Sequence, residues 1–226
     1  MLRVLSDALS AADGQRVTLM GLLELTAAFD CVDHTLLLKQ LQLEFGFADT
    51  VLSWLTSFVT GRTQQVAFDG HMSATTSVEF GVLQGSVLGP LLFVLYTAQL
   101  SQVVAAHGLT LHQYAYDCQV YLTTSVSDAP TAVSRFTDCL DVIATWMSTR
   151  RLRLNPTKTQ VMWLGSKHQV DRITIHSVPV LSTSVNVVDT ARDLGVVVDS
   201  TLTMSNHVAA VCCATYFQLQ QIRMIA

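Results

Sequence analysis

From residue 18 to residue 60 the sequence contains one apolar segment followed by two amphipathic ones. Residues 18–25 are an almost unbroken apolar run, which is typical of a strand that is buried on both faces. In residues 35–45 and 48–60 the apolar positions recur at helical spacing, and this pattern predicts two amphipathic helices. A buried strand followed by two helices is therefore expected.

A hairpin and a further helix are predicted next. Residues 63–68 and 73–80 flank Asp69-Gly70, a dipeptide that is strongly favoured at hairpin turns. A glycine-rich loop follows and leads into a helix predicted from about residue 91 to 104.

The second half of the chain is also expected to contain both strands and helices. Alternation of apolar and polar residues in 109–123 predicts a hairpin with Asp117 at its tip, and a helix fits residues 129–149. Further strands are expected at 159–164, 173–180 and 191–198, and a last helix at 204–225.

The composition is that of a globular, apolar domain. Hydrophobic residues make up 50% of the chain and charged residues 13%, with a net charge of -4 and a pI near 5.9. This balance counts against strong autonomous binding to nucleic acid, which usually needs a basic surface. One basic cluster, Arg150, Arg151 and Arg153, fits either a contact with a nucleic-acid backbone or a solvated helix end.

Other features bear on compartment and partners. The five cysteines form no CxxC pair, so we expect reduced, buried thiols rather than a zinc site. The N-terminus lacks the apolar core of a leader peptide, and the apolar stretch at 87–98 is shorter than the roughly 20 residues of a membrane span. We therefore expect a cytoplasmic or nuclear protein that is not secreted and has neither membrane contact nor a small-molecule cofactor.

Five segments in order carry a family resemblance. They are LLELTAAFDCVDH at 22–34, GVLQGSVLGPLLF at 81–93, YAYD at 114–117, RLRLNPTKTQVMWLG at 151–165 and RDLGVVVDSTLTMSNHV at 192–208. Together they resemble motifs A to D and the primer-grip region of LINE-like, non-LTR retrotransposon reverse transcriptases. The resemblance implies RNA-directed DNA synthesis by a nucleotidyltransferase that uses Mg²⁺, an RNA template and a DNA primer.

The resemblance also implies a set of catalytic positions, two of which are substituted. The motif A aspartate corresponds to Glu24 and the motif C pair to Tyr116 and Asp117. Glu24 is one methylene longer than aspartate, and the phenol of Tyr116 is neutral at pH 7 and offers no anionic oxygen to a metal. Metal ligation is left to Asp117 and Glu24, so we expect Mg²⁺ to bind weakly or not at all and the chain to be catalytically inactive.

Other positions of the family motifs are assigned by the same resemblance. Phe29 corresponds to the aromatic gate at the sugar of the incoming nucleotide, and Gln84 and Gly85 correspond to the nucleotide-binding loop. Lys158 corresponds to the lysine proposed to protonate pyrophosphate, although a lone lysine after Asn-Pro is more often a solvated turn residue. The primer-grip positions are Leu194 and Gly195.

These features predict an α/β (α+β) fold, a polymerase palm with an antiparallel sheet backed by helices and a partial thumb. We expect residues 1–170 to form the palm and residues 171–226 the primer-grip region and the start of the thumb. The family's fingers precede motif A, and we expect this chain to lack them. Two alternatives to an inactive polymerase domain stay open: a non-catalytic module that binds RNA or protein, and a relic without function.

Overall fold

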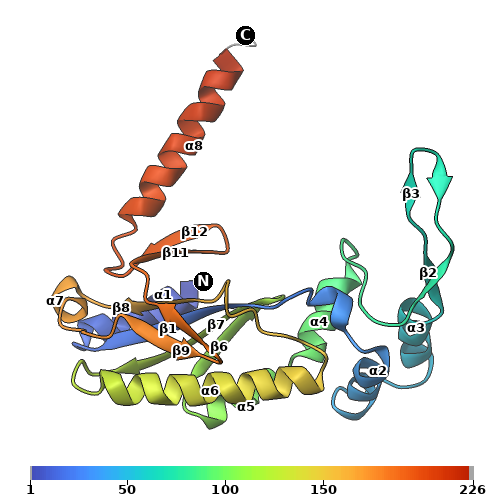
Figure 1. Cartoon of the computed structure of the whole chain (residues 1–226), viewed down its shortest axis with the longest axis horizontal. Coiled ribbons are helices and arrows are strands. Elements are labelled where there is room, and N and C mark those ends of the chain that lie inside the picture. The colour runs from blue at the N-terminus through green and yellow to red at the C-terminus, as the bar shows by residue number, and fades with distance from the viewer. Residues whose placement is uncertain (1, 224–226) are drawn as a thin grey trace.

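The computed structural model describes residues 2–223, which form a mixed α/β fold with antiparallel sheets (Figure 1). The helices are α1 (Leu2–Asp13), η1 (Phe29–Cys31), α2 (His34–Leu43), α3 (Asp49–Val59), α4 (Leu88–Tyr96), α5 (Leu100–Ala106), α6 (Ala129–Thr149), α7 (Lys167–Val170) and α8 (Ser205–Arg223). The strands are β1 (Val17–Glu24), β2 (Arg62–Gln64), β3 (Ala67–Phe68), β4 (His71–Met72), β5 (Thr76–Val78), β6 (Thr110–Tyr114), β7 (Asp117–Thr124), β8 (Gln160–Leu164), β9 (Ser177–Val180), β10 (Thr183–Asn186), β11 (Thr190–Asp193) and β12 (Val196–Asp199).

A four-stranded antiparallel sheet in the order β6-β7-β1-β8 is the centre of the molecule. Strand β1 pairs with β7 along its whole length, from Val17 opposite Thr124 to Glu24 opposite Asp117. The register therefore places the last residue of β1 beside the first residue of β7. Strands from distant parts of the sequence meet at this end of the sheet.

Both faces of the sheet are covered, which explains the continuous apolar run of β1. Side chains alternate between the faces of a strand, and Leu19 and Leu23 pack in the main core together with the α6 residues Phe136 and Leu140. Met20, on the opposite face, belongs to a second core with residues of α1, β11 and β12. Figure 1 shows α6 along one side of the sheet and the β11–β12 hairpin on the other.

Gly21 allows α6 to approach the centre of β1. A Cβ atom at this position would lie 2.5 Å from Cζ of Phe136 and 3.4 Å from its Cε2. Real Cβ contacts are never that short, and Phe136 is fully buried. Any larger residue would therefore displace the helix or the ring.

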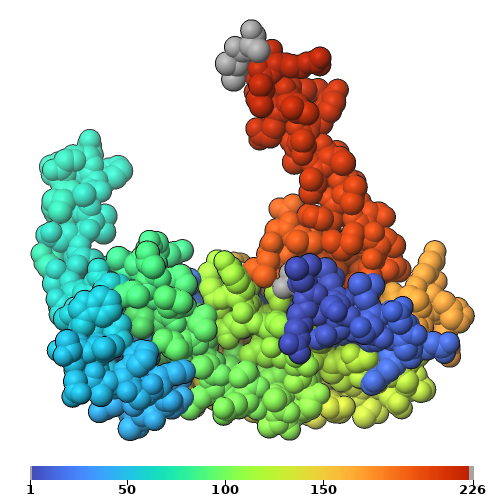
Figure 2. Space-filling model, turned by 180° about the vertical axis from the view of Figure 1, so that it is seen from behind, coloured from blue at the N-terminus to red at the C-terminus, as the bar shows by residue number. Residues whose placement is uncertain are grey.

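Two segments project from the body on the same side, as Figures 1 and 2 show. One is the hairpin arm, defined as residues 62–78, whose apolar side chains Val66, Phe68 and Met72 are exposed. The other is α8, which has no buried residue. Both segments therefore have apolar side chains in contact with solvent.

Helix α8 is joined to the body through Asp199 at the end of β12. The Asp199 carboxylate accepts hydrogen bonds from the backbone N–H groups of Thr201 (3.2 Å), Thr203 (2.9 Å) and Met204 (2.7 Å). Burial raises the pKa of this carboxyl, but the hydrogen bonds from Thr203, Thr201 and Met204 outweigh it and hold the pKa below its ordinary value. The charged carboxylate thus organises the turn that starts α8.

One described segment, Leu88–Ala106, is by length and composition apolar enough to cross a membrane. In the structure it is divided into α4 and α5 by a turn, and its side chains Phe93, Tyr96 and Val104 lie in the main core. The prediction of a single helix from residue 91 to 104 is therefore wrong, because a turn separates two shorter helices there.

Most predicted elements are present, with some corrections. The strand at 18–25, the helix at 129–149 and the hairpin around Asp117 are confirmed, whereas the N-terminal helix α1 was not predicted. The prediction of buried thiols is right for Cys118 and Cys139 but wrong for Cys212 and Cys213, which are exposed on α8, a helix without buried residues.

Candidate functional site

The candidate site lies where β1 ends and β7 begins. Glu24 and Asp117 are register partners on these antiparallel strands, so their side chains leave the sheet on the same face. The β6–β7 turn has only two residues, Ala115 and Tyr116, and Ala115 adopts a left-handed φ of 53°. This tight turn places Tyr116 immediately beside Asp117.

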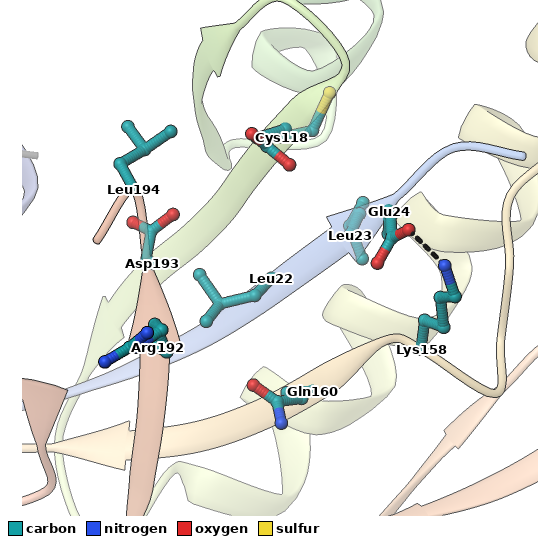
Figure 3. Close-up of a pocket in the computed structure, with 10 residues that line it drawn as sticks. Leu22, Leu23, Glu24, Cys118, Lys158, Gln160, Arg192, Asp193 and Leu194 are labelled. Atoms are coloured by element: carbon teal, nitrogen blue, oxygen red, sulfur yellow. Dashed lines mark hydrogen bonds and ion pairs between the residues drawn. The ribbon is translucent and has the colours of Figure 1, made fainter. Parts of the chain in front are cut away.

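Glu24 is paired with a lysine. Lys158 follows the Asn155-Pro156 turn, and its Nζ lies 2.6 Å from Oε1 of Glu24 (Figure 3). The backbone supports this pairing because the N–H of Asn155 donates to the carbonyl of Glu24 at 2.9 Å. The hydrogen bond and charge of Glu24 raise the pKa of the Lys158 ammonium. The lysine is therefore protonated at neutral pH and compensates the Glu24 charge.

The Tyr116 ring packs on another residue of the site. Its centroid lies 5.7 Å from that of Phe29, with an interplanar angle of 87°, an edge-to-face geometry that is favourable for aromatic rings. Phe29 in turn packs against Phe93 of α4 at 5.2 Å. Tyr116 thus extends the aromatic core to the surface of the site.

A small pocket joins several of the predicted positions. It has a volume of about 200 Å³ and is lined by Glu24, Phe29, Gln84 and Tyr116, among others. Gln84 is exposed in the loop before α4, and Gly85 follows it, also exposed, without lining this pocket. The structure therefore brings Gln84 into one pocket with Glu24 and Tyr116 and leaves Gly85 outside it.

A second pocket, with a volume of about 390 Å³, lies between the sheet and the β11–β12 hairpin. We call it the carboxylate pocket, because Glu24, Asp117 and Asp193 all line it together with Lys158 and Arg192 (Figure 3). Asp193 did not emerge from the sequence as a site residue. It reaches the pocket only because β11 folds over the sheet.

Asp117 is in an unfavourable place for a negative charge. Burial raises the pKa of its carboxyl, and the charges of Asp193 and Glu24 raise it further. The neighbouring Cys118 points to the other face of β7, where burial and the charge of Asp117 raise the pKa of its thiol to about 12. Cys118 is therefore an unreactive core residue and no thiolate ligand.

The predicted primer-grip positions form the turn between β11 and β12. Asp193 pairs with Val196, and the two loop residues Leu194 and Gly195 have φ values of 47° and 84°. Positive φ at both central residues is typical of type I′ hairpin turns, in which Asn-Gly is the preferred pair. Leu194 holds a conformation that is unfavourable for its side chain, and it lines the carboxylate pocket.

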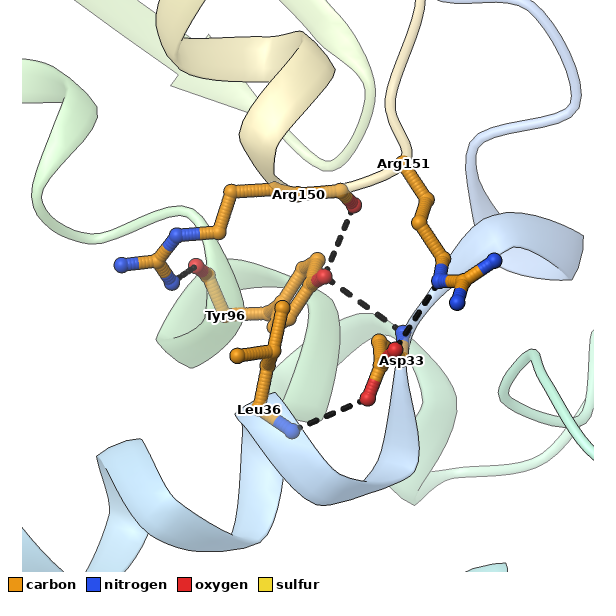
Figure 4. Close-up of polar contacts among 5 residues, drawn as sticks. All are labelled: Asp33, Leu36, Tyr96, Arg150 and Arg151. Carbon is orange, nitrogen blue, oxygen red and sulfur yellow. Dashed lines mark hydrogen bonds and ion pairs between the residues drawn. The ribbon is translucent and has the colours of Figure 1, made fainter.

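Two arginines of the basic cluster make contacts within the protein (Figure 4), while Arg151 and Arg153 are exposed. Arg150 donates hydrogen bonds to Gln40, Gln99 and the carbonyl of Tyr96. Nε of Arg151 lies 2.9 Å from Oδ2 of Asp33.

The hydroxyl of Tyr96 completes this network by donating to the carbonyl of Arg150 at 2.7 Å. Arg150 is therefore held by contacts within the protein, whereas the side chain of Arg151 is 56% exposed and only its Nε is paired, with Asp33.

Comparison with known structures identifies the fold. A structure of apo telomerase from Candida tropicalis superimposes with a TM-score of 0.56 at 13% sequence identity, covering 82% of this chain and 38% of that one. Telomerase from Candida albicans in complex with a TWJ fragment of telomeric RNA gives a TM-score of 0.56 at 14% identity, covering 86% and 34%. At these identities the likeness concerns the fold alone.

Sequence comparison is more specific. The family described as "Reverse transcriptase (RNA-dependent DNA polymerase)" matches residues 2–197. The chain belongs to the reverse transcriptase family. It is 30% identical over 210 residues to the probable RNA-directed DNA polymerase from transposon X-element of Drosophila melanogaster, covering 91% of this chain. It is 29% identical over 216 residues to the polymerase from mobile element jockey of Drosophila funebris, covering 92%. This chain spans 22% of the length of each of these two relatives.

Reverse transcriptases are polymerases whose chemistry implies divalent metal, so the site can be tested for its fit to a pair of ions. Glu24 is ion-paired to Lys158, and Tyr116 presents a neutral ring instead of a carboxylate. Among residues 2–223, no group of three or more His, Cys, Asp or Glu side chains is arranged to hold a metal ion. The residues present at these positions do not fit a two-ion catalytic centre.

Proposed function

We propose that this chain is a LINE-like reverse transcriptase domain that has lost nucleotidyl transfer. In this proposal residues 1–170 are the palm and residues 171–226 are the primer-grip region and the start of a thumb. The ancestral substrates are an RNA template and a DNA primer, and the protein acts in the cytoplasm or nucleus. The homology to the X-element and jockey polymerases supports this origin.

The observation that carries the loss of activity is the state of the two substituted positions. Nucleotidyl transfer needs anionic oxygens that hold two divalent ions beside the attacking 3′-oxygen and the leaving pyrophosphate. Tyr116 instead packs edge-on against Phe29, and Glu24 is held by Lys158 at 2.6 Å. Losing several kcal/mol of metal catalysis corresponds to roughly a thousandfold or more in rate.

The remaining predicted residues have consistent roles in such an inactive site. Phe29 and Gln84 line one pocket with the substituted residues, which is the location expected for nucleotide-binding positions. Lys158, the proposed proton donor to pyrophosphate, is instead the counterion of Glu24. An internal ion pair thus replaces the interaction with substrate.

Primer extension tests the proposal. The chain is assayed on a primed RNA template with deoxynucleotides and Mg²⁺ or Mn²⁺, beside a matched Asp117→Asn variant. We expect no template-dependent product from either protein. Product that requires the metal and disappears in Asp117→Asn would refute the proposal.

A chimera tests the site in the context of a full-length relative, of which this chain spans 22%. The matching 210-residue segment of the X-element polymerase is replaced by this chain, with and without the reversions Glu24→Asp and Tyr116→Asp. We expect synthesis only from the reverted chimera, while both chimeras bind the template in a filter-binding assay. Equal synthesis by the unreverted chimera would show that Glu24 and Tyr116 do not limit the reaction.

A further inference from the structure

Helix α8 carries an exposed apolar stripe. The residues of this stripe follow one another at alternating spacings of four and three positions, and each of them is exposed: Val208, Cys212, Thr215, Leu219 and Ile222. Residues spaced in this way lie on one face of a helix. The opposite face carries Asn206, Gln220 and Gln221 beside Phe217. The helix therefore has the pattern of one that packs on a partner, although none of its residues is buried.

The charge of α8 narrows the class of partner. From residue 205 to residue 222 the sequence contains no Asp, Glu, Lys or Arg. A nucleic-acid surface is bound through Lys and Arg side chains that neutralise phosphates, and helices that lie on a membrane are rich in Lys and Arg on their polar face. The stripe therefore fits the apolar face of another protein helix.

A second copy of α8 offers such a face. Helices that select a different protein usually carry complementary charges beside the apolar stripe, whereas the first charged side chain of α8 is Arg223 at its last position. Two copies present identical uncharged stripes, and in a symmetric dimer the same surface serves both partners. Figures 1 and 2 show α8 projecting clear of the body, so a second helix can approach it.

The size of the stripe sets the strength of such a pair. Val208, Leu219 and Ile222 are 58%, 55% and 61% exposed, and Tyr216 beside them is 64% exposed. Packing two such stripes together would remove on the order of 900 Å² of surface from water, which is below the roughly 1,200–2,000 Å² of stable complexes. A reversible pair that forms at micromolar concentrations is therefore expected, rather than a permanent dimer.

We propose that this protein self-associates through α8, with the stripe of one copy packed against the stripe of a second copy. The apolar side chains of both stripes leave water, which drives the association, and no charge is buried in the interface. The interface is separate from the carboxylate pocket and does not depend on whether the chain polymerises DNA.

Sedimentation equilibrium of the full chain from about 1 to 200 μM, in the presence of a reducing agent, tests the interface. The proteins compared are the unmodified chain, Leu219→Glu, which places a charge in the stripe, and Gln221→Glu, which places the same charge on the opposite face of α8. We expect a monomer–dimer equilibrium for the unmodified chain and for Gln221→Glu, and an association constant at least tenfold lower for Leu219→Glu. Neither residue is buried, so both variants should keep the circular dichroism spectrum of the unmodified chain.

Cysteine cross-linking provides an independent readout. Thr215 lies midway along the stripe, so a two-fold axis brings it beside its own copy whether the two helices run parallel or antiparallel. Thr215→Cys and Gln221→Cys are each made in a chain with Cys212→Ala and Cys213→Ala. Copper phenanthroline then takes two electrons from a pair of thiols, which release two protons and form a disulfide. We expect a cross-linked dimer from Thr215→Cys, and no more from Gln221→Cys than from the chain without an added cysteine.

Any of three results would overturn the interface: a monomer at every concentration, a dimer whose association constant Leu219→Glu leaves within twofold, or equal cross-linking through positions 215 and 221. Failure of the proposed function would appear in primer extension instead, so the two conclusions are tested separately.

Discussion

Restoring an acid at position 116 should destabilise the protein. The Tyr116 ring lies edge-on to Phe29 at 5.7 Å, and such pairs contribute about 0.5–1.5 kcal/mol beyond their buried area. Aspartate at this position would also add a negative charge beside Asp117, whose pKa burial, Asp193 and Glu24 already raise. One further pKa unit corresponds to about 1.4 kcal/mol. We expect Tyr116→Asp to lower the free energy of unfolding by about 2–3 kcal/mol at pH 7.5, and the melting temperature by roughly 4–12 °C.

Urea unfolding followed by circular dichroism at pH 7.5 and pH 5 separates the two contributions. Tyr116→Phe keeps the ring and should stay within about 0.5 kcal/mol of the unmodified chain. Tyr116→Asn loses the ring without adding charge, so it should lie between the unmodified chain and Tyr116→Asp. The gap between the Asp and Asn variants should narrow at pH 5 as the carboxyl takes up a proton. The reasoning would be refuted if Tyr116→Asp were as stable as the unmodified chain. It would also be refuted if Tyr116→Asn lost as much free energy of unfolding as Tyr116→Asp at pH 7.5.

Three further predictions concern stability, each measured by urea unfolding. Gly21→Ala should lower the free energy of unfolding by about 1–3 kcal/mol through its clash with Phe136. Gly14→Ala, whose Cβ would have no neighbour closer than 3.4 Å, should lower it by less than about 0.5 kcal/mol. Equal effects of the two substitutions would contradict the packing argument. Asp199→Asn should cost about 1–3 kcal/mol at pH 7. The pKa of Asp199 is lower in the folded protein than its ordinary value of 3.8. The charged carboxylate therefore stabilises the fold above pH 3.8, and this stabilisation is lost as the pH falls through the native pKa. The difference in free energy of unfolding between the two proteins should shrink in acid, and a difference that stays constant would argue against this role. Leu194→Asn should stabilise the chain by about 0.5–1 kcal/mol, since asparagine tolerates the positive φ, and a loss of stability would show that packing of the leucine side chain outweighs backbone strain.

The central sheet could be predicted from the sequence because its signals are local. The apolar run of β1 and the alternation around Asp117 each lie within one short segment, and both strands are present as expected. Helix α1 was missed although its buried residues Val4, Ala8 and Ala11 recur at helical spacing, because an amphipathic pattern alone does not show what a helix packs against. The exposed thiols of α8 were mispredicted for a related reason, since a sequence does not reveal whether a helix has a packing partner.

The site was predictable in part. Motif spacing brought Glu24, Asp117 and Lys158 into one candidate site, but it gave no sign that Lys158 pairs with Glu24 across 134 positions. Asp193 was overlooked because its burial depends on the β11–β12 hairpin lying over the sheet. An acidic residue in an otherwise apolar segment was its only local signal, and such residues are more often solvated than buried.

The attachment of α8 has a mechanical consequence. The helix has 19 residues and no buried side chain, and its first turn is tied to the body by the carboxylate of Asp199. At 1.5 Å per residue the helix is about 28 Å long, so it behaves as a lever with its pivot at one end. A tilt of about 10° at the pivot displaces the far end by about 5 Å. Protonation or substitution of Asp199 therefore acts at the start of the helix, where a small change of angle gives the largest displacement of the far end.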